Sequence, residues 1–187
     1  AGNGLSWAAA KKTIQAAVNT ASSGDVVRVT NGVYSTGGTV TPGGTLTNRV
    51  VIAKPIRVES VEGWLYTTIN GAGPLGAGAV RCVYLSQHAV LSGFTLLEGH
   101  TSSAGSPQNG AGGGAFLEQQ GTLTNCYVYN CQAGIYGGGV YARNGGLVTD
   151  CIINNCSVPG MIGGGGGGGA GLWYATVRNS IIRQCQT

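Results

Sequence analysis

The fold of this chain is decided by residues 112–133, GGGAFLEQQGTLTNCYVYNCQA, and by their near-copy at residues 137–158, GGGVYARNGGLVTDCIINNCSV. The two stretches align without a gap at a spacing of 25 residues, so that Cys126 falls on Cys151. Self-similarity at a fixed spacing of about 20 to 50 residues is the signature of a repeat architecture. Each copy therefore represents one structural unit, and we expect such units to stack.

Two weaker copies flank this pair. A shortened copy occupies residues 169–187, where Cys185 falls on Cys156, and another occupies residues 82–101, where Phe94 takes the place of a cysteine. The copies contain short runs with alternating apolar residues, such as CYVYN and SIIRQ, and none has a helical period. A unit of about 25 residues with short strands and Gly/Asn-rich turns predicts one coil of a β-solenoid.

Stacked coils place corresponding side chains in columns about 4.8 Å apart. Three inward columns are expected: Leu96, Val128, Ile153 and Ile182; Leu91, Leu123, Val148 and Val177; and Phe94, Cys126, Cys151 and Ser180. One outward column is expected to be aromatic: Tyr84, Phe116, Tyr141 and Trp173. At the turns, Asn130, Asn155 and Gln184 form a polar column whose amides can hydrogen-bond along the axis.

The N-terminal part contains the one convincing helix. In residues 11–22, KKTIQAAVNTAS, the side chains of Ile14 and Val18 share one face. We expect this helix to lie over the open end of the first coil and to cover its unpaired strand edges. Residues 1–10 then form an N-terminal arm and residues 25–187 form the coils, so that the whole chain is a single β-helix domain.

The chain resembles the right-handed parallel β-helix, or pectate-lyase-like, superfamily and its uncharacterised secreted bacterial members. The resemblance rests on the opening GNGLSWAAAKKTIQAAVNTASSGDVVRVTNGVY, on LSGFTLLEG, and on coils of the form GGG-(apolar)-Y…NC-x-(V/I)-x-N. It implies an all-β fold, a right-handed parallel β-helix of about six to seven coils with a short N-terminal capping helix. For an enzyme of this superfamily, the resemblance implies either a lyase that uses clustered acidic residues with calcium or a hydrolase that uses two or three aspartates. The same fold hosts adhesins and structural proteins, so it does not select a function.

The composition excludes several function classes. Charged residues make up 9% of the chain, against about 25% in an average domain, and there are 36 glycines without a collagen period. The ten basic residues are scattered, which argues against nucleic-acid binding. No apolar run approaches the roughly 18 residues that span a bilayer. A surface of Gly, Ser, Thr, Asn and Gln is typical of extracellular or cell-surface β proteins.

The titratable residues give no pattern that points to catalysis. The six acidic residues are Asp25, Glu59, Glu62, Glu98, Glu118 and Asp150. The alignment stacks no two of them as the carboxylate pair that glycoside hydrolysis requires, and we interpret them as solvated turn residues. His88 and His100 lack the spacing of a zinc site. We therefore expect no catalytic residue, metal site or cofactor, and whether the protein is an enzyme stays open.

The six cysteines allow two interpretations. They are small buried side chains that fill a narrow core, or some of them form disulfides between adjacent coils, since a Cα separation of about 4.8 Å falls within the disulfide range. Cys185, in the last copy, is a candidate for contact with a neighbouring subunit.

The end of the last copy, SIIRQCQT, carries no capping segment, and an uncovered strand edge pairs readily with another chain. The leading hypothesis is an extracellular structural or adhesive protein whose copies assemble head to tail into a fibre, with Trp7 and Cys185 as assembly contacts. The glycine run at residues 163–169 is then expected to enlarge a turn that packs against another subunit.

A carbohydrate-binding or polysaccharide-cleaving β-helix is the alternative hypothesis. In that case the aromatic column Tyr84, Phe116, Tyr141 and Trp173 stacks on sugar rings. A third hypothesis is a domain of a large surface adhesin.

Overall fold

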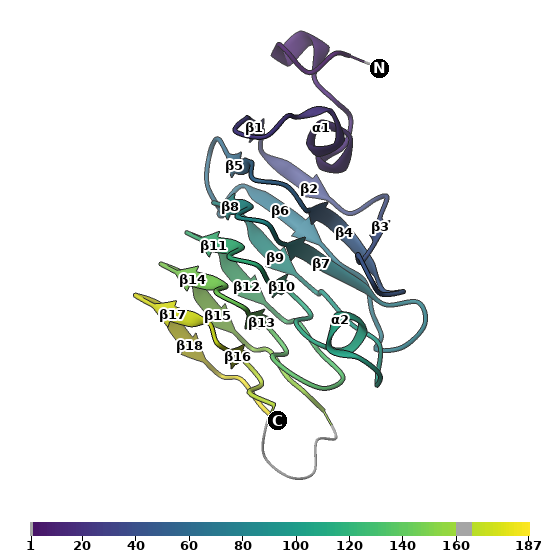
Figure 1. Cartoon of the computed structure of the whole chain (residues 1–187), viewed down its shortest axis with the longest axis vertical. Helices are drawn as coiled ribbons and strands as arrows, with labels where there is room; N and C mark the ends of the chain where they lie inside the picture. The colour runs from purple at the N-terminus through teal and green to yellow at the C-terminus, as the bar shows by residue number, and fades with distance from the viewer. Residues whose placement is uncertain (1, 160–165) are drawn as a thin grey trace.

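The protein is a parallel β-solenoid, in which the chain winds repeatedly through three sheets (Figure 1). A computed structural model describes residues 2–159 and 166–187. Each complete turn contributes one strand to each of three six-stranded sheets, here named sheets A, B and C. The described residues form about five complete turns after an incomplete first one, fewer than the six to seven expected. The difference arises because the chain before strand β4 (Thr47–Ile52) forms only short strands, and the last of these pairs antiparallel with β4.

The strands of each sheet follow one another along the solenoid axis. Sheet A contains β1 (Val26–Val29), β5 (Arg57–Ser60), β8 (Val90–Ser92), β11 (Thr122–Thr124), β14 (Leu147–Thr149) and β17 (Thr176–Arg178). Sheet B contains β2 (Gly32–Tyr34), β6 (Thr67–Asn70), β9 (Thr95–Leu97), β12 (Tyr127–Tyr129), β15 (Ile152–Asn154) and β18 (Ile181–Arg183). Sheet C contains β3 (Thr39–Val40), β4 (Thr47–Ile52), β7 (Val80–Leu85), β10 (Ala115–Leu117), β13 (Val140–Arg143) and β16 (Ala170–Trp173). All neighbouring strands are parallel except the β3–β4 pair.

Single residues in the left-handed conformation turn the chain at the corners between sheets. Asn125 and Asn130 have φ values of 51° and 54°, and Asn155, one turn later, has 51°. Asparagine tolerates this conformation better than most residues, because its short side chain bonds locally. The Asn155 side chain also donates a hydrogen bond of 3.4 Å to Asn130 Oδ1, so the polar column is joined along the axis.

The glycine triplets occupy a corner where successive turns approach closely. A Cβ on Gly138 would lie 2.2 Å from the carbonyl oxygen of Ser157, which no side chain can tolerate. Because Val140 pairs with Ala170, the last three glycines of the long run, residues 167–169, fill this same position one turn later. The expected packing of the enlarged turn, residues 163–169, on another subunit falls partly outside the described residues, which resume at residue 166.

The core is a continuous stack of inward side chains. Leu96, Val128, Ile153 and Ile182 pair in register across sheet B, and Leu91, Leu123, Val148 and Val177 do so across sheet A. The corner column Phe94, Cys126 and Cys151 is buried between them. Repeated backbone hydrogen bonds fix this corner, such as Ile152 N to the Cys126 carbonyl at 2.9 Å and Ile181 N to the Cys151 carbonyl at 2.9 Å.

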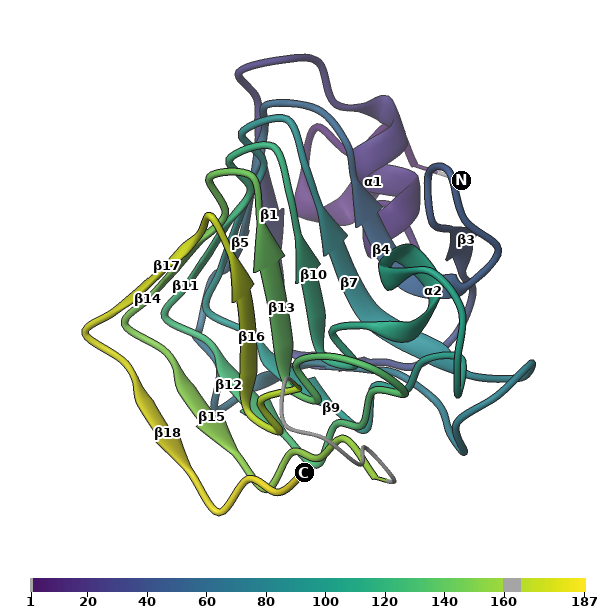
Figure 2. The ribbon, with the colours of Figure 1, turned by 60° about the horizontal axis from the view of Figure 1, so that its bottom comes forward.

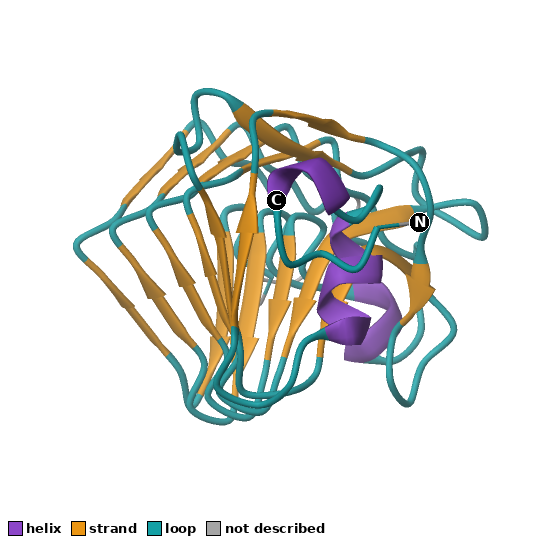
Figure 3. Ribbon diagram, turned by 90° about the horizontal axis from the view of Figure 1, so that it is seen from above, coloured by secondary structure: helices purple, strands orange, loops and turns teal. Residues whose placement is uncertain are grey.

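A short helix covers the sheet C side of the N-terminal end of the stack (Figure 3). Helix α1 covers Ile14–Thr20, shorter at both ends than the expected 11–22, because the Thr13 side chain accepts the Ala16 N–H at 3.1 Å and caps the helix there. Ile14 and Val18 are buried in the core. The helix also protects a strand edge: the Gln15 amide donates to the Val51 carbonyl (3.1 Å) and accepts the Val51 N–H (2.7 Å). Gln15 thus replaces a strand neighbour for β4.

The inward columns predict a large difference between two neighbouring isoleucines of β15 and β18. Ile153 is fully buried, whereas Ile181 on the outer face of β18 is 56% exposed. We expect Ile153→Ala to lower the free energy of unfolding by about 2 to 5 kcal/mol, and Ile181→Ala by less than about 1 kcal/mol. Equilibrium urea unfolding of both variants measures the difference, and equal losses would contradict this description of the core.

Candidate functional site

The expected aromatic column on sheet C forms, but it is not exposed. Tyr84, Phe116 and Tyr141 pair in register on β7, β10 and β13, with ring centroids 5.7 Å and 5.3 Å apart. Tyr84 is 2%, Phe116 0% and Tyr141 8% exposed. These rings cannot stack on a sugar, so the site expected for carbohydrate is not present on this column.

Trp173 does not belong to the column, and its expected placement is wrong. The residue that pairs with Tyr141 is Gly171, whereas Trp173 pairs with Arg143 and is 61% exposed. Only the first strand of the last copy, β16, is therefore shifted by two residues from the expected alignment, since Val177 and Ile182 pair as expected. A shift of two keeps every side chain on the same face of the strand, so the alternation of apolar residues cannot detect it.

Two non-repeating loops cover the aromatic column. The first contains the short helix α2 (Pro107–Gly110), which lies outside sheet C (Figure 2). In the second, the Tyr136 ring lies against that of Tyr141, with centroids 5.8 Å apart. Asn109 fixes the first loop, because its side-chain oxygen accepts the N–H groups of Thr45 (2.8 Å) and Leu46 (3.1 Å). The column is thus the centre of a second, smaller core.

A buried arginine anchors the covering loop. Arg81 is fully buried, and its guanidinium lies 5.0 Å from the centroid of the Phe116 ring. It donates to the carbonyls of Gln108 (2.7 Å) and Ala111 (2.8 Å) and to Asn48 Oδ1 (2.8 Å). Burial lowers the pKa of Arg81 to about 9, so the side chain remains charged at neutral pH. These contacts hold the loop against sheet C.

Glu118 is a buried member of this second core, and its interpretation as a solvated turn residue is wrong. It is 7% exposed and accepts hydrogen bonds from the Tyr84 hydroxyl and from Arg143, whose Nε lies 2.7 Å from Glu118 Oε2. Burial, and secondly the hydrogen bond to the Glu118 carboxylate, raise the pKa of Tyr84 to about 12. The group is a structural ion-pair network under a loop.

The six cysteines are free thiols in the structure. Cys126 and Cys151 occupy the buried corner column, where burial raises the pKa of the Cys126 thiol well above its ordinary value and the contact with Cys126 lowers the pKa of Cys151. Burial also raises the pKa of the Cys131 thiol, and buried thiols with a raised pKa are unreactive. Cys185 is only partly buried, in the last turn, where its sulfur accepts the Cys156 N–H at 3.5 Å.

The last turn presents an apolar strand edge (Figure 2). Within the described part of the chain, β16, β17 and β18 each pair with one neighbouring strand only. Ile182 is 46% exposed, although Ile153, the preceding member of the same column, is fully buried. The other large exposed apolar side chains of this turn are Leu172, Trp173, Tyr174 and Ile181.

Trp7 lies at the opposite end of the solenoid. It begins the 3₁₀ helix η1 (Trp7–Ala9) in the N-terminal arm and is 59% exposed. Between the arm, α1 and β1 runs a groove of about 710 Å³, lined by Trp7, by Leu5 and by the length of β1. The structure therefore keeps Trp7 and Cys185 of one chain apart, at the two ends.

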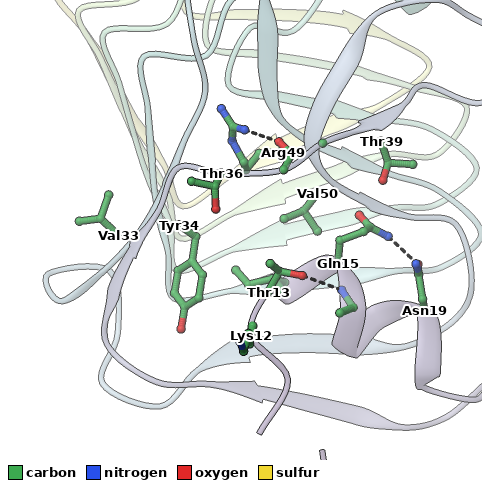
Figure 4. A pocket seen from close by; sticks show the side chains of 14 residues that line it. Lys12, Thr13, Gln15, Asn19, Val33, Tyr34, Thr36, Thr39, Arg49 and Val50 are labelled. Atoms are coloured by element: carbon green, nitrogen blue, oxygen red, sulfur yellow. Dashed lines mark hydrogen bonds between the residues drawn. The ribbon is translucent and has the colours of Figure 1, made fainter. Parts of the chain in front are cut away.

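A pocket of about 460 Å³ lies beside α1, between the helix, the segment after β2 and β4. Figure 4 shows Lys12 and Arg49 on opposite sides of it, with Thr13, Tyr34 and Thr36 between them. Sequence reasoning missed this pocket, because its residues come from three separate segments that follow no repeat.

Sequence reasoning also missed an aromatic group on the outer face of sheet B. The Trp64 and Tyr127 ring centroids are 5.3 Å apart, and those of Tyr127 and Tyr129 are 5.6 Å apart. The Asn154 amide donates to the Tyr127 hydroxyl at 2.9 Å. Asn154 Oδ1 is buried and has no hydrogen-bond partner among the described residues. The alternation of Tyr127 and Tyr129 with inward Val128 was the available signal.

Across residues 2–159 and 166–187, no three His, Cys, Asp or Glu side chains gather in a way that could hold a metal ion. His88 and His100 lie apart, at a left-handed corner (φ 61°) and in a loop. None of the described helices is long and apolar enough to cross a membrane. No protein-family model matches the chain, and no curated protein or solved structure shows significant similarity to it.

The raised pKa of Tyr84 predicts a loss of stability in alkali. The pKa of this tyrosine is 10.0 in the unfolded chain, its ordinary value, and about 12 in the folded protein. Between these values the unfolded state has lost the proton and the folded state has not, so stability falls as pH rises. Denaturant unfolding at about pH 9 and about pH 11 should show a smaller fall for Tyr84→Phe than for the unchanged protein.

The control is Tyr174→Phe, because Tyr174 is 82% exposed. It should keep the full alkaline fall. If Tyr84→Phe and Tyr174→Phe show the same fall, the Tyr84–Glu118 network does not have the described electrostatics.

Proposed function

We propose that this protein is an extracellular structural or adhesive β-solenoid module whose last turn binds a further turn from a second copy, head to tail. The observation that carries the proposal is the loss of burial within one column, from 0% at Ile153 to 46% at Ile182. A further turn would bury Ile182 and the unpaired edges of β16–β18 together. Membership of the right-handed pectate-lyase-like superfamily is part of this proposal, supported by the capping helix and the three-sheet turn.

The receiving surface in this arrangement is the first, incomplete turn. β1 and β2 each have one strand neighbour among the described residues, β5 and β6. Val27 and Tyr34 begin the sheet A and sheet B columns, so they would continue the columns that Val177 and Ile182 end in the other copy. The third side is occupied by α1. Trp7, beside the groove along β1, would contact the incoming turn.

The charges across this contact are compatible with it. If the register continues, Arg178 lies beside Arg28. The Arg28 guanidinium is already paired with Glu59 at 3.3 Å, which reduces the repulsion between the two arginines. A head-to-tail contact does not close on itself and therefore generates a filament. The low proportion of charged residues, 9%, fits a durable extracellular material.

Assembly through the last turn predicts concentration-dependent growth. We expect sedimentation velocity to show species that lengthen as the protein concentration rises, and electron microscopy to show thin filaments. Ile182→Lys should abolish the growth, because an unpaired charge buried in the contact costs about 3 kcal/mol or more. Gln119→Lys is the control, since Gln119 is exposed in a middle turn, between β10 and β11. A protein that remains monomeric at every concentration contradicts the proposal.

Carbohydrate binding remains the second candidate function, on the outer face of sheet B instead of the covered column. The Trp64–Tyr127–Tyr129 group offers partly exposed aromatic surface on which a sugar ring can stack, whereas the oxygen of the Asn154 amide is buried and out of reach of a sugar. Arg183 is the next residue in register after Asn154.

This candidate is tested with a panel of polysaccharides that includes polyuronides, with and without calcium. We expect retardation in affinity electrophoresis, and Tyr127→Ala should weaken it, whereas Tyr174→Ala should not. Unsaturated products released from a polyuronide would show a lyase. No retardation by any polysaccharide would remove the candidate.

A further inference from the structure

The pocket beside α1 is lined by three segments that lie apart in the sequence. The lining residues come from 12–19, which include the start of α1, from 33–39, which run from β2 to the start of β3, and from 49–50 in β4. Its volume of about 460 Å³ falls within the range of about 300 to 1,000 Å³ that is typical of small-molecule sites. A free inorganic ion would fill only a small part of it.

The pocket contains two cations and no carboxylate. Lys12 is exposed and makes no hydrogen bond or ion pair within the described residues. Arg49 is 9% exposed and donates to the carbonyls of Asn70 (2.8 Å), Gly71 (3.3 Å) and Gly37. Three of its five N–H groups are thus used, and carbonyl dipoles are its only partners there. Burial lowers the pKa of Arg49, which reflects a charge held without a full counter-charge.

The remaining polar groups are mostly free to donate. The Asn19 side-chain oxygen already accepts the Gln15 amide at 2.8 Å, which leaves its NH₂ group for a ligand. The side-chain oxygens of Gln15 and Thr13 are used as well, by Val51 N and Ala16 N. The hydroxyls of Thr36 and Thr39 make no hydrogen bond within the described residues, and hydroxyls serve as donors or acceptors. An excess of donors over acceptors favours a negatively charged ligand.

We infer that this pocket binds a small organic oxyanion, whose phosphate or carboxylate group contacts Lys12 and whose hydroxylated remainder lies against the threonines. The two cations stand on opposite sides of the pocket, so the anionic group binds toward one of them while the field of the other adds to the attraction (Figure 4). The site lies at the N-terminal end, and Tyr34 belongs both to its lining and to the surface proposed to receive a second copy. Binding is therefore measured on the dilute, unassembled chain, and it does not require assembly through the last turn.

The test is isothermal titration calorimetry of the dilute full chain with three probes: glucose 6-phosphate, gluconate and glucose. We expect one or both anionic probes to bind, with an affinity that falls as salt is added, and glucose not to bind. Binding by glucose 6-phosphate alone identifies phosphate as the recognised group, and binding by gluconate alone identifies carboxylate.

Two lysine variants separate this site from general surface charge. Lys12→Gln should weaken binding of the anion about tenfold or more, because a charge-assisted hydrogen bond is lost. Lys11→Gln removes the same charge from the adjacent residue, which does not line the pocket, and should leave the affinity within about twofold. The inference is overturned if neither anion binds, if glucose binds as tightly, or if the two variants weaken binding equally.

Discussion

The rest of the structure depends on the in-register backbone hydrogen bonds between successive turns. Each strand repeats the pairing of the one before, so a residue is obliged to lie above its counterpart, as in Leu96, Val128 and Ile153. The small set of residue types at each position follows from this constraint. A corner must bend, which favours asparagine in the left-handed conformation, and a close approach of backbones admits only glycine, as at Gly138.

The first and the last described turns of the stack differ in what covers them. At the N-terminal end the helix buries Ile14 and Val18, and the Gln15 amide satisfies the backbone of Val51 as a strand would. In the last described turn Ile182 is exposed, although Ile153 in the same column is fully buried. The hydrophobic effect and the unsatisfied strand edges act in the same direction there, and both favour a further turn.

Few residues are charged, and the structure buries several of those present. Arg81 is surrounded by carbonyl and amide oxygens, and Glu118 is bound by Arg143 and Tyr84. Burial of a charged group is costly unless all of its hydrogen-bond partners are in place. These groups therefore hold the covering loops in a single conformation and add little to the stability. The result is a second core outside the solenoid, which removes the aromatic column from any role at the surface.

The repeat spacing of 25 residues determined the solenoid and its inward columns, because periodic burial leaves a periodic pattern in the sequence, and the apolar face of Ile14 and Val18 separately determined the helix at its start. The spacing did not determine which outward residues are exposed. Tyr84 and Phe116 are covered by loops that occur once and follow no period, and Trp173 was misplaced because a slip of two residues preserves the alternation. The pocket of Lys12 and Arg49 and the Trp64–Tyr127 contact join segments far apart in the chain, and only the tertiary structure brings such residues together.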